Sequence, residues 1–117
     1  MAKRADEIVK IAYKALDDKK AEDIKIIDIG DISVIADYFV IANGTNSSQV
    51  EAMVDQVTDE LAKQDIHPAR VEGIRSSGWI LMDFNDVVIH IFSKEDRLFY
   101  DLERIWRDGK IVEPESL

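Results

Sequence analysis

Apolar residues recur every three or four positions in three parts of the chain, with polar residues between them. This spacing places the apolar side chains on one face of an α-helix. It predicts helices over residues 5–19, 48–64 and 94–107. Ser48 and Glu51 match a capping box, which predicts that the second helix begins at Ser48.

Short runs rich in β-branched and aromatic residues predict five strands, at residues 24–29, 38–42, 69–72, 79–84 and 87–92. The run at residues 38–42 is apolar throughout, which is typical of a strand covered on both faces. A helix separates this strand from the one at residues 69–72. We therefore expect a right-handed crossover connection between them.

The last two predicted strands are separated only by Asn85 and Asp86, which both tolerate a positive φ. A two-residue hairpin turn at this point fixes the register of the strands. The expected pairs are Phe84 with Val87, Asp83 with Val88, Met82 with Ile89, Leu81 with His90, Ile80 with Ile91, and Trp79 with Phe92.

Alternation along the two strands divides the hairpin into two faces. One face is entirely apolar and is expected in the core: Ile80, Met82, Phe84, Val87, Ile89 and Ile91. The other face is apolar but includes an acid and an imidazole: Trp79, Leu81, Asp83, Val88, His90 and Phe92. This second face is either a further core layer beneath a helix or, if Trp79 and Asp83 reach solvent, an aromatic patch typical of protein interfaces.

These elements predict one α/β domain over residues 1–108, with a mixed sheet of about five strands flanked by three helices. Residues 109–117 are expected to form a short acidic tail. The length of 117 residues fits one domain rather than two.

The chain carries 15 basic and 24 acidic residues, a formal charge of −9, and no cysteine. A lack of cysteine excludes disulfides and thiolate chemistry, and it fits a reducing cytosol. The acidic balance argues against direct nucleic-acid binding, which depends on Lys and Arg, and favours a basic protein as partner. No apolar run reaches the length of a membrane span and no signal peptide is recognisable, so we expect a cytoplasmic protein without a membrane contact.

Signals for catalysis or cofactor binding are weak. The two histidines, His67 and His90, have no zinc-site spacing, and the turn at residues 43–48 is neither a P-loop nor a dinucleotide fingerprint. Three acids lie near strand ends but form no Asp-x-Asp pair: Asp28, Asp31 and Asp37. We therefore expect no cofactor, no metal and no enzyme activity. A nucleotide-binding or nucleotidyltransferase-like enzyme that uses these residues remains the alternative.

The chain resembles the ribosomal silencing factor family, RsfS, also called Iojap. The resemblance spans about residues 5–108 and rests on five segments in the family's order and spacing: residues 37–45, 72–73, 79–83, 86–92 and 97–106. Asn85 stands where the family commonly has Gly at the hairpin turn. Asn tolerates a positive φ, so we expect the turn to form.

The resemblance implies a translational repressor rather than an enzyme. Members bind a basic protein of the large ribosomal subunit, the fourteenth, and obstruct joining with the small subunit, which lowers protein synthesis when nutrients are scarce. The implied fold is a nucleotidyltransferase-like sheet without the catalytic acids. Homodimers are also reported in the family, and an adaptor with a target unrelated to ribosomes is a further hypothesis.

We expect the partner to meet the second face of the hairpin. Trp79, Leu81 and Phe92 would be apolar anchors, and three acids would pair with cationic side chains: Glu72, Asp83 and Asp86. His90 would donate or accept a hydrogen bond there, or orient Asp83. Arg97 and Tyr100 would either support the hairpin or extend the contact with the partner. We favour the structural role for both residues. The same face could instead meet a second copy of the chain or a helix of its own domain.

Overall fold

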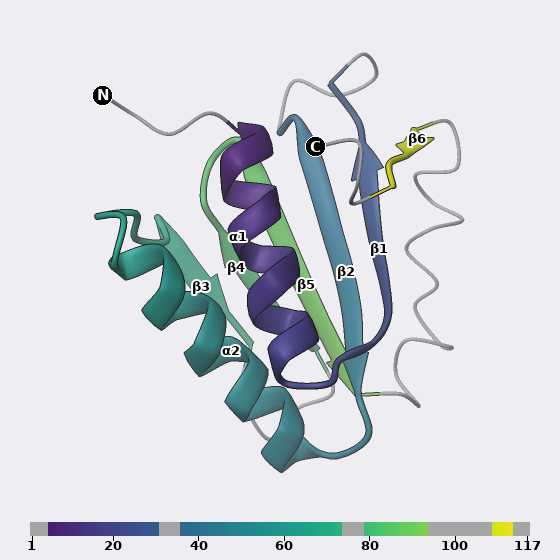
Figure 1. Cartoon of the computed structure of the whole chain (residues 1–117), viewed down its shortest axis with the longest axis vertical. Helices are drawn as coiled ribbons and strands as arrows, with labels where there is room; N and C mark the ends of the chain where they lie inside the picture. Colours follow the sequence, from purple (N-terminus) through teal and green to yellow (C-terminus); the bar gives the residue numbers. More distant parts are fainter. Residues whose placement is uncertain (1–4, 31–35, 74–78, 94–108, 114–117) are drawn as a thin grey trace.

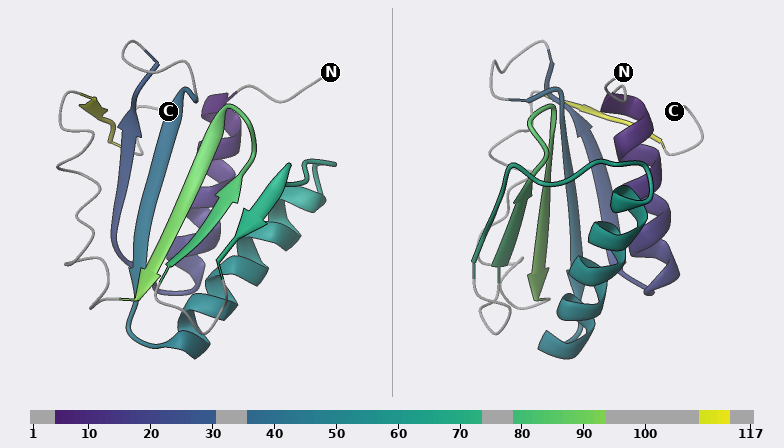
Figure 2. Two further views of the ribbon diagram at one scale, coloured as in Figure 1. Left: turned by 180° about the vertical axis from the view of Figure 1, so that it is seen from behind. Right: turned by 90° about the vertical axis from the view of Figure 1, so that its left-hand side faces the viewer.

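Two helices pack on one face of a six-stranded sheet in the computed structural model, which describes residues 5–30, 36–73, 79–93 and 109–113 (Figure 1). The helices are α1 (Ala5–Asp18) and α2 (Ser47–Ala62). The strands are β1 (Glu22–Asp28), β2 (Tyr38–Gly44), β3 (Arg70–Glu72), β4 (Trp79–Asp83), β5 (Val87–Ser93) and β6 (Lys110–Ile111). Figure 2 shows, in its right-hand view, the helices in one layer and the sheet in the other.

The strand order is β3-β4-β5-β2-β1-β6, with β2 and β5 parallel and the other neighbours antiparallel. This confirms the predicted α/β class, the mixed sheet and all five predicted strands. Strand β3 runs parallel to β2 with two strands between them, as expected if α2 is a crossover connection. The third predicted helix, at residues 94–107, lies outside the described residues.

The sixth strand has no counterpart in the sequence prediction, which placed residues 109–117 in an acidic tail. Residues 110 and 111 pair with Asp28 and Ile27 of β1. A two-residue strand is too short to show a period, so no pattern could predict it. Gly109 allows the approach, since a Cβ there would lie 2.6 Å from Cγ2 of Ile27.

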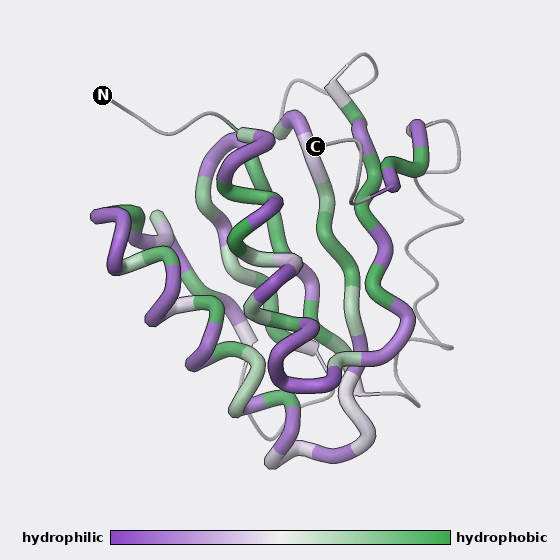
Figure 3. Tube along the Cα trace, in the orientation of Figure 1, coloured by the Kyte–Doolittle hydropathy of each residue, from purple (hydrophilic) through white to green (hydrophobic). Residues whose placement is uncertain are grey.

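Both faces of the sheet are apolar. The face toward the helices carries all six hairpin residues predicted for the core, packed with the apolar stripes of α1 and α2. The opposite face carries a second buried cluster, which Trp79 and Leu81 adjoin as partly buried residues: Ile27, Ile29, Ala36, Phe39, Ile41, Val88 and Phe92. Figure 3 shows the result as hydrophobic colour along much of β2 and β5, and as alternating colours along the helices.

The hairpin has the predicted register. Strands β4 and β5 pair from Trp79 with Phe92 to Asp83 with Val88. Beyond them, the backbone N–H of Phe84 donates to the carbonyl of Val87 at 2.9 Å. Asn85 adopts φ +73°, the left-handed conformation that Asn tolerates, so the expected turn forms.

The start of helix α2 differs from the prediction. Asn46 caps the helix, and its side chain accepts a hydrogen bond from the N–H of Gln49 at 2.8 Å. Ser48 lies inside the helix, so the capping box of Ser48 and Glu51 was wrong. Asn is as good a cap as Ser, and Asn46 has its own partner three residues later, which explains the error.

Gln49 joins two turns that lie far apart in the sequence. Its Oε1 accepts from the N–H and the hydroxyl of Thr45, at 2.7 and 2.8 Å. Its Nε2 donates to the carbonyls of Lys19 and Lys20, at 3.1 and 2.9 Å. The turn before α2 is therefore fastened to the end of α1 by one side chain.

Replacing Gln49 with Met keeps the side-chain length and removes these four hydrogen bonds. We expect the free energy of unfolding in urea to fall by about 1–3 kcal/mol, since each net hydrogen bond contributes modestly. The matched control is Gln56→Met on the same helix, where the side chain makes a hydrogen bond of 3.4 Å with Glu60. Equal losses in the two variants would show that Gln49 has no special structural role.

Candidate functional site

A hollow of about 210 Å³ lies at the junction of β3 and β4, lined by Glu72, Gly73, Trp79 and Leu81. Glu72 lies opposite Leu81 in the antiparallel pair, and Trp79 precedes Leu81 by two residues on the same face. Three of the predicted site residues therefore meet here. Gly73 was not predicted as a site residue. The sequence did contain a signal for it, because residues 72–73 are one of the segments that resemble the family.

Asp83 is paired within its own chain. Its Oδ2 lies 3.4 Å from Nε of Arg70, directly opposite on β3, and its Oδ1 accepts the N–H of Asn85 at 2.8 Å. Arg70 also lies 3.3 Å from the carboxylate of Glu72. The Asp83 side chain is 21% exposed, so it is neither an isolated buried charge nor a fully solvated one. Arg70 was missed because the sequence pattern did not show that β3 pairs with β4.

The indole of Trp79 is held in place by two buried side chains of β5, His90 and Phe92. Its Nε1–H donates to Nδ1 of His90 at 3.2 Å. The ring stacks on Phe92, with ring centres 5.5 Å apart and planes inclined by 17°. Trp79 itself is only partly buried. The exposed part of the indole is thus held in one orientation.

Two of the expected contact residues lie inside the molecule. Phe92 is 0% exposed and His90 is 4% exposed. Phe92 therefore supports the Trp79 ring and offers no surface of its own to a partner. His90 accepts a hydrogen bond from Trp79 of its own hairpin, and Asp83 takes its hydrogen bond from Asn85, so His90 does not orient Asp83. The hydrogen bond expected between His90 and a partner stays a prediction.

His90 is held neutral by burial, which lowers the pKa of its imidazole from 6.5 to about 4. A tryptophan N–H can only donate, so Nδ1 of His90 is the acceptor and the ring proton is on Nε2. Among the described residues, Nε2 has no hydrogen-bond partner. Protonation would place a charge in an aromatic environment and break the bond to Trp79.

The other predicted site residues lie elsewhere. Asp86 is exposed at the hairpin turn, where its carbonyl accepts from the N–H groups of Asp37 and Tyr38. It is not among the residues that line the hollow. Arg97 and Tyr100 lie outside the described residues.

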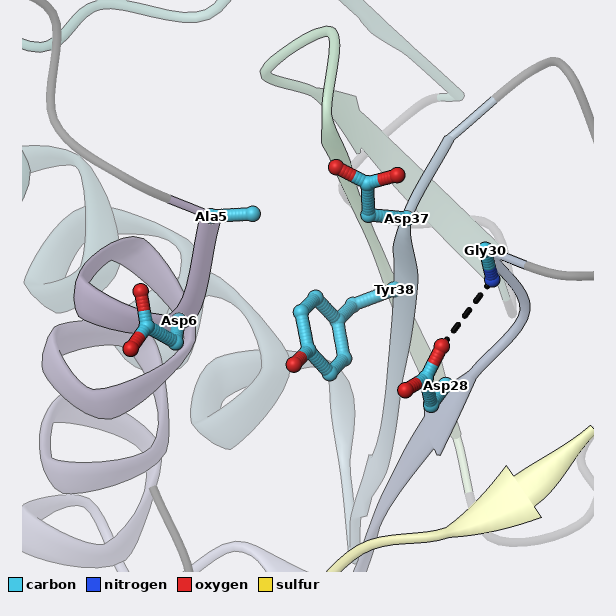
Figure 4. A pocket seen from close by; sticks show the side chains of 6 residues that line it. All are labelled: Ala5, Asp6, Asp28, Gly30, Asp37 and Tyr38. Carbon is cyan, nitrogen blue, oxygen red and sulfur yellow. Dashed lines mark hydrogen bonds between the residues drawn. The ribbon is translucent and has the colours of Figure 1, made fainter.

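A second depression, of about 440 Å³, gathers acidic residues near the start of α1 (Figure 4). Asp28 and Asp37, singled out in the sequence, line it together with Asp6, and the Tyr38 ring lies between α1 and the strands. Asp28 accepts the N–H of Gly30 at 3.0 Å.

Across the ranges that the structure describes, no three His, Asp or Glu side chains are grouped to hold a metal ion. No helix in those ranges is long and apolar enough to cross a membrane.

The lowered pKa of His90 predicts acid sensitivity. Between about pH 6.5 and pH 4 the unfolded state binds the proton and the folded state does not, so the free energy of unfolding falls as the pH drops through this window. From about pH 7.5 to pH 5 this contribution amounts to roughly 2 kcal/mol. Urea unfolding at both pH values measures it.

His90→Gln is the comparison for this measurement, because Gln keeps a polar acceptor but does not titrate. The loss between the two pH values should be smaller in the variant by that amount. Identical losses in the two proteins would show that His90 titrates normally in the folded state.

Comparison with known proteins gives a consistent result. A sequence profile of the family described as "Ribosomal silencing factor during starvation" matches residues 2–117. Ribosomal silencing factor RsfS of Bacillus subtilis is 41% identical over 106 residues, which cover 91% of this chain and 90% of the relative. RsfS of Halalkalibacterium halodurans is 39% identical and covers 95% of each chain. The chloroplastic Iojap protein of Arabidopsis thaliana is 31% identical, over 93% of this chain and 44% of that protein.

Solved structures show the same fold. A crystal structure of a Chromobacterium violaceum protein superposes with a TM-score of 0.86 at 31% identity, over 95% of this chain and 92% of that one. A Bacillus halodurans protein gives 0.81 at 36% identity, over 92% and 97% of the chains. The match in sequence and fold extends over nearly the whole chain, and the chain therefore belongs to the ribosomal silencing factor family.

Proposed function

We propose that this protein binds the fourteenth protein of the large ribosomal subunit and thereby blocks association with the small subunit. Membership of the family supports a role in ribosome-associated silencing of translation, and the family's names describe a regulatory factor rather than an enzyme. By occupying the joining face, the protein would lower protein synthesis under nutrient limitation. A homodimer is a further prediction from the resemblance, and a cytoplasmic location is a further prediction from the sequence.

The observation that carries this proposal is the surface formed by Glu72, Trp79, Leu81 and Asp83, called here the Trp79 surface. It combines a partly exposed indole with an apolar neighbour and two carboxylates. Interface hot spots are enriched in Trp and are surrounded by contacts that exclude water. A partly exposed Trp on a sheet face, with charges at its edge, has this composition.

Rigidity of the indole favours binding. The hydrogen bond to His90 and the stack on Phe92 restrict the side chain before a partner arrives. An anchor that is already ordered loses less conformational entropy on association, so more of its contact energy appears as affinity.

Charge favours a basic partner. The net charge of −9 attracts a protein rich in Lys and Arg over a distance of about one Debye length, and it speeds association at low salt. Contact through the Trp79 surface would add the specificity that net charge lacks. Binding alone would then be enough for inhibition, because a protein of 13.3 kDa bound to the joining face of the large subunit sterically excludes the small subunit.

Trp79→Ala tests the surface. Truncation of a hot-spot residue costs about 2 kcal/mol or more, so binding to purified large subunits should weaken by roughly 30-fold. Co-sedimentation through sucrose gradients measures binding, and light scattering of mixed subunits measures the loss of inhibition. Asp83 is left unchanged in this experiment, because its replacement would also break the pairing with Arg70 and Asn85.

The control is Val71→Ala on the neighbouring strand β3. Val71 is 48% exposed and lies opposite Met82, which packs on the helix side of the sheet. This variant should bind large subunits as the unmodified protein does. A folded Trp79→Ala variant that still co-sediments fully would reject the Trp79 surface as the docking site.

A further inference from the structure

The hollow beside Trp79 has the size of one side chain. Pockets for cofactors and drug-sized ligands measure about 300–1,000 Å³, and this one measures about 210 Å³. Its walls come from the adjacent strands β3 and β4 and from the glycine that follows β3. It is therefore suited to one residue of a partner protein.

The lining is apolar on one side and anionic on the other. Trp79 and Leu81 provide the apolar wall, and Glu72, opposite Leu81, provides a carboxylate. Lys and Arg side chains bury their methylene stems against apolar surface and keep the charged group at a polar edge. An indole face also attracts a cation directly.

The local charge leaves room for a second cation. Arg70 is the cation of both ion pairs, with Glu72 at 3.3 Å and with Asp83 at 3.4 Å, so the three side chains together carry one net negative charge. The side chains of Arg70 and Glu72 are more than half exposed, and pairs of this kind are weak. A carboxylate has two oxygens, so Glu72 can accept an additional cation without losing Arg70.

Gly73 fixes the shape of the hollow. It adopts φ +99°, and a Cβ at this position would lie 2.3 Å from the carbonyl oxygen of Trp79. Only glycine permits this approach of the chain to β4. The end of β3, with Glu72 directly before Gly73, is thereby kept close to Trp79 of β4.

We infer that this hollow takes one lysine or arginine side chain of the ribosomal partner. The methylenes of that residue pack on Trp79 and Leu81, and its charged group pairs with Glu72. The inference rests on the proposed function, and it specifies the chemistry by which the Trp79 surface recognises its partner.

The test is binding of Glu72→Gln to purified large subunits at about 100 mM and 500 mM salt, since screening separates ionic from apolar contributions. At the lower salt the affinity should fall about five- to tenfold, and at the higher salt the difference should be less than about twofold. Glu72→Lys should bind more weakly still at low salt, because a like charge then meets the incoming cation.

The matched control is Asp59→Asn, which changes the net charge equally at an exposed position of α2. It should alter the affinity by less than about twofold, because it lies outside the contact. Equal effects of Asp59→Asn and Glu72→Gln would show that the loss of affinity comes from the change in net charge and not from a contact with Glu72. That result would overturn the inference. Thermal unfolding of each variant shows whether it is folded.

The outcomes separate the two proposals. If Glu72→Gln binds as the unmodified protein does at both salt concentrations while Trp79→Ala loses binding, the hollow holds no cation and the proposed function stands. If neither variant loses binding, the Trp79 surface itself is wrong. An effect of Glu72→Gln that is the same at both salt concentrations would also contradict an ionic contact.

Discussion

The register of the β4–β5 hairpin determines which side chains this protein presents. Ile80, Met82 and their partners on β5 are buried against the two helices. Because successive residues of a strand face opposite sides, burying this set places Trp79, Leu81 and Asp83 on the other face. A slip of one residue would exchange the two sets and expose the core residues instead. The large apolar burial on the helix side thus fixes the position of the candidate site on the other side.

The same register also supplies the support for Trp79. It places His90 and Phe92 on the face that carries the indole, so that one accepts its N–H and the other stacks against it. Burial keeps His90 neutral, which preserves the hydrogen bond at physiological pH. A partly exposed aromatic residue is therefore rigid, and rigid aromatic residues are efficient anchors for a partner.

Much of the fold could be predicted from the sequence, because two helices have a clear apolar period and most of the strands have clear alternating or continuous apolar patterns. The hairpin register was predictable as well, since the turn has only two residues. Other features depend on contacts distant in the chain. Strand β3 has three residues and shows no alternation, so its pairing with β4 and the bond between Arg70 and Asp83 left no local signal. Strand β6 is shorter still. Alternation also predicts the face of a side chain but not its exposure, which is why Phe92 was expected at the surface and lies fully inside.

The central claim is that the Trp79 surface meets the large ribosomal subunit. A cryo-electron microscopy reconstruction of the protein on that subunit tests it most directly. The account predicts the indole of Trp79 and the carboxylate of Glu72 in contact with a basic ribosomal protein on the joining face. A reconstruction with this surface in open solvent, and another face of the molecule in contact, would contradict it.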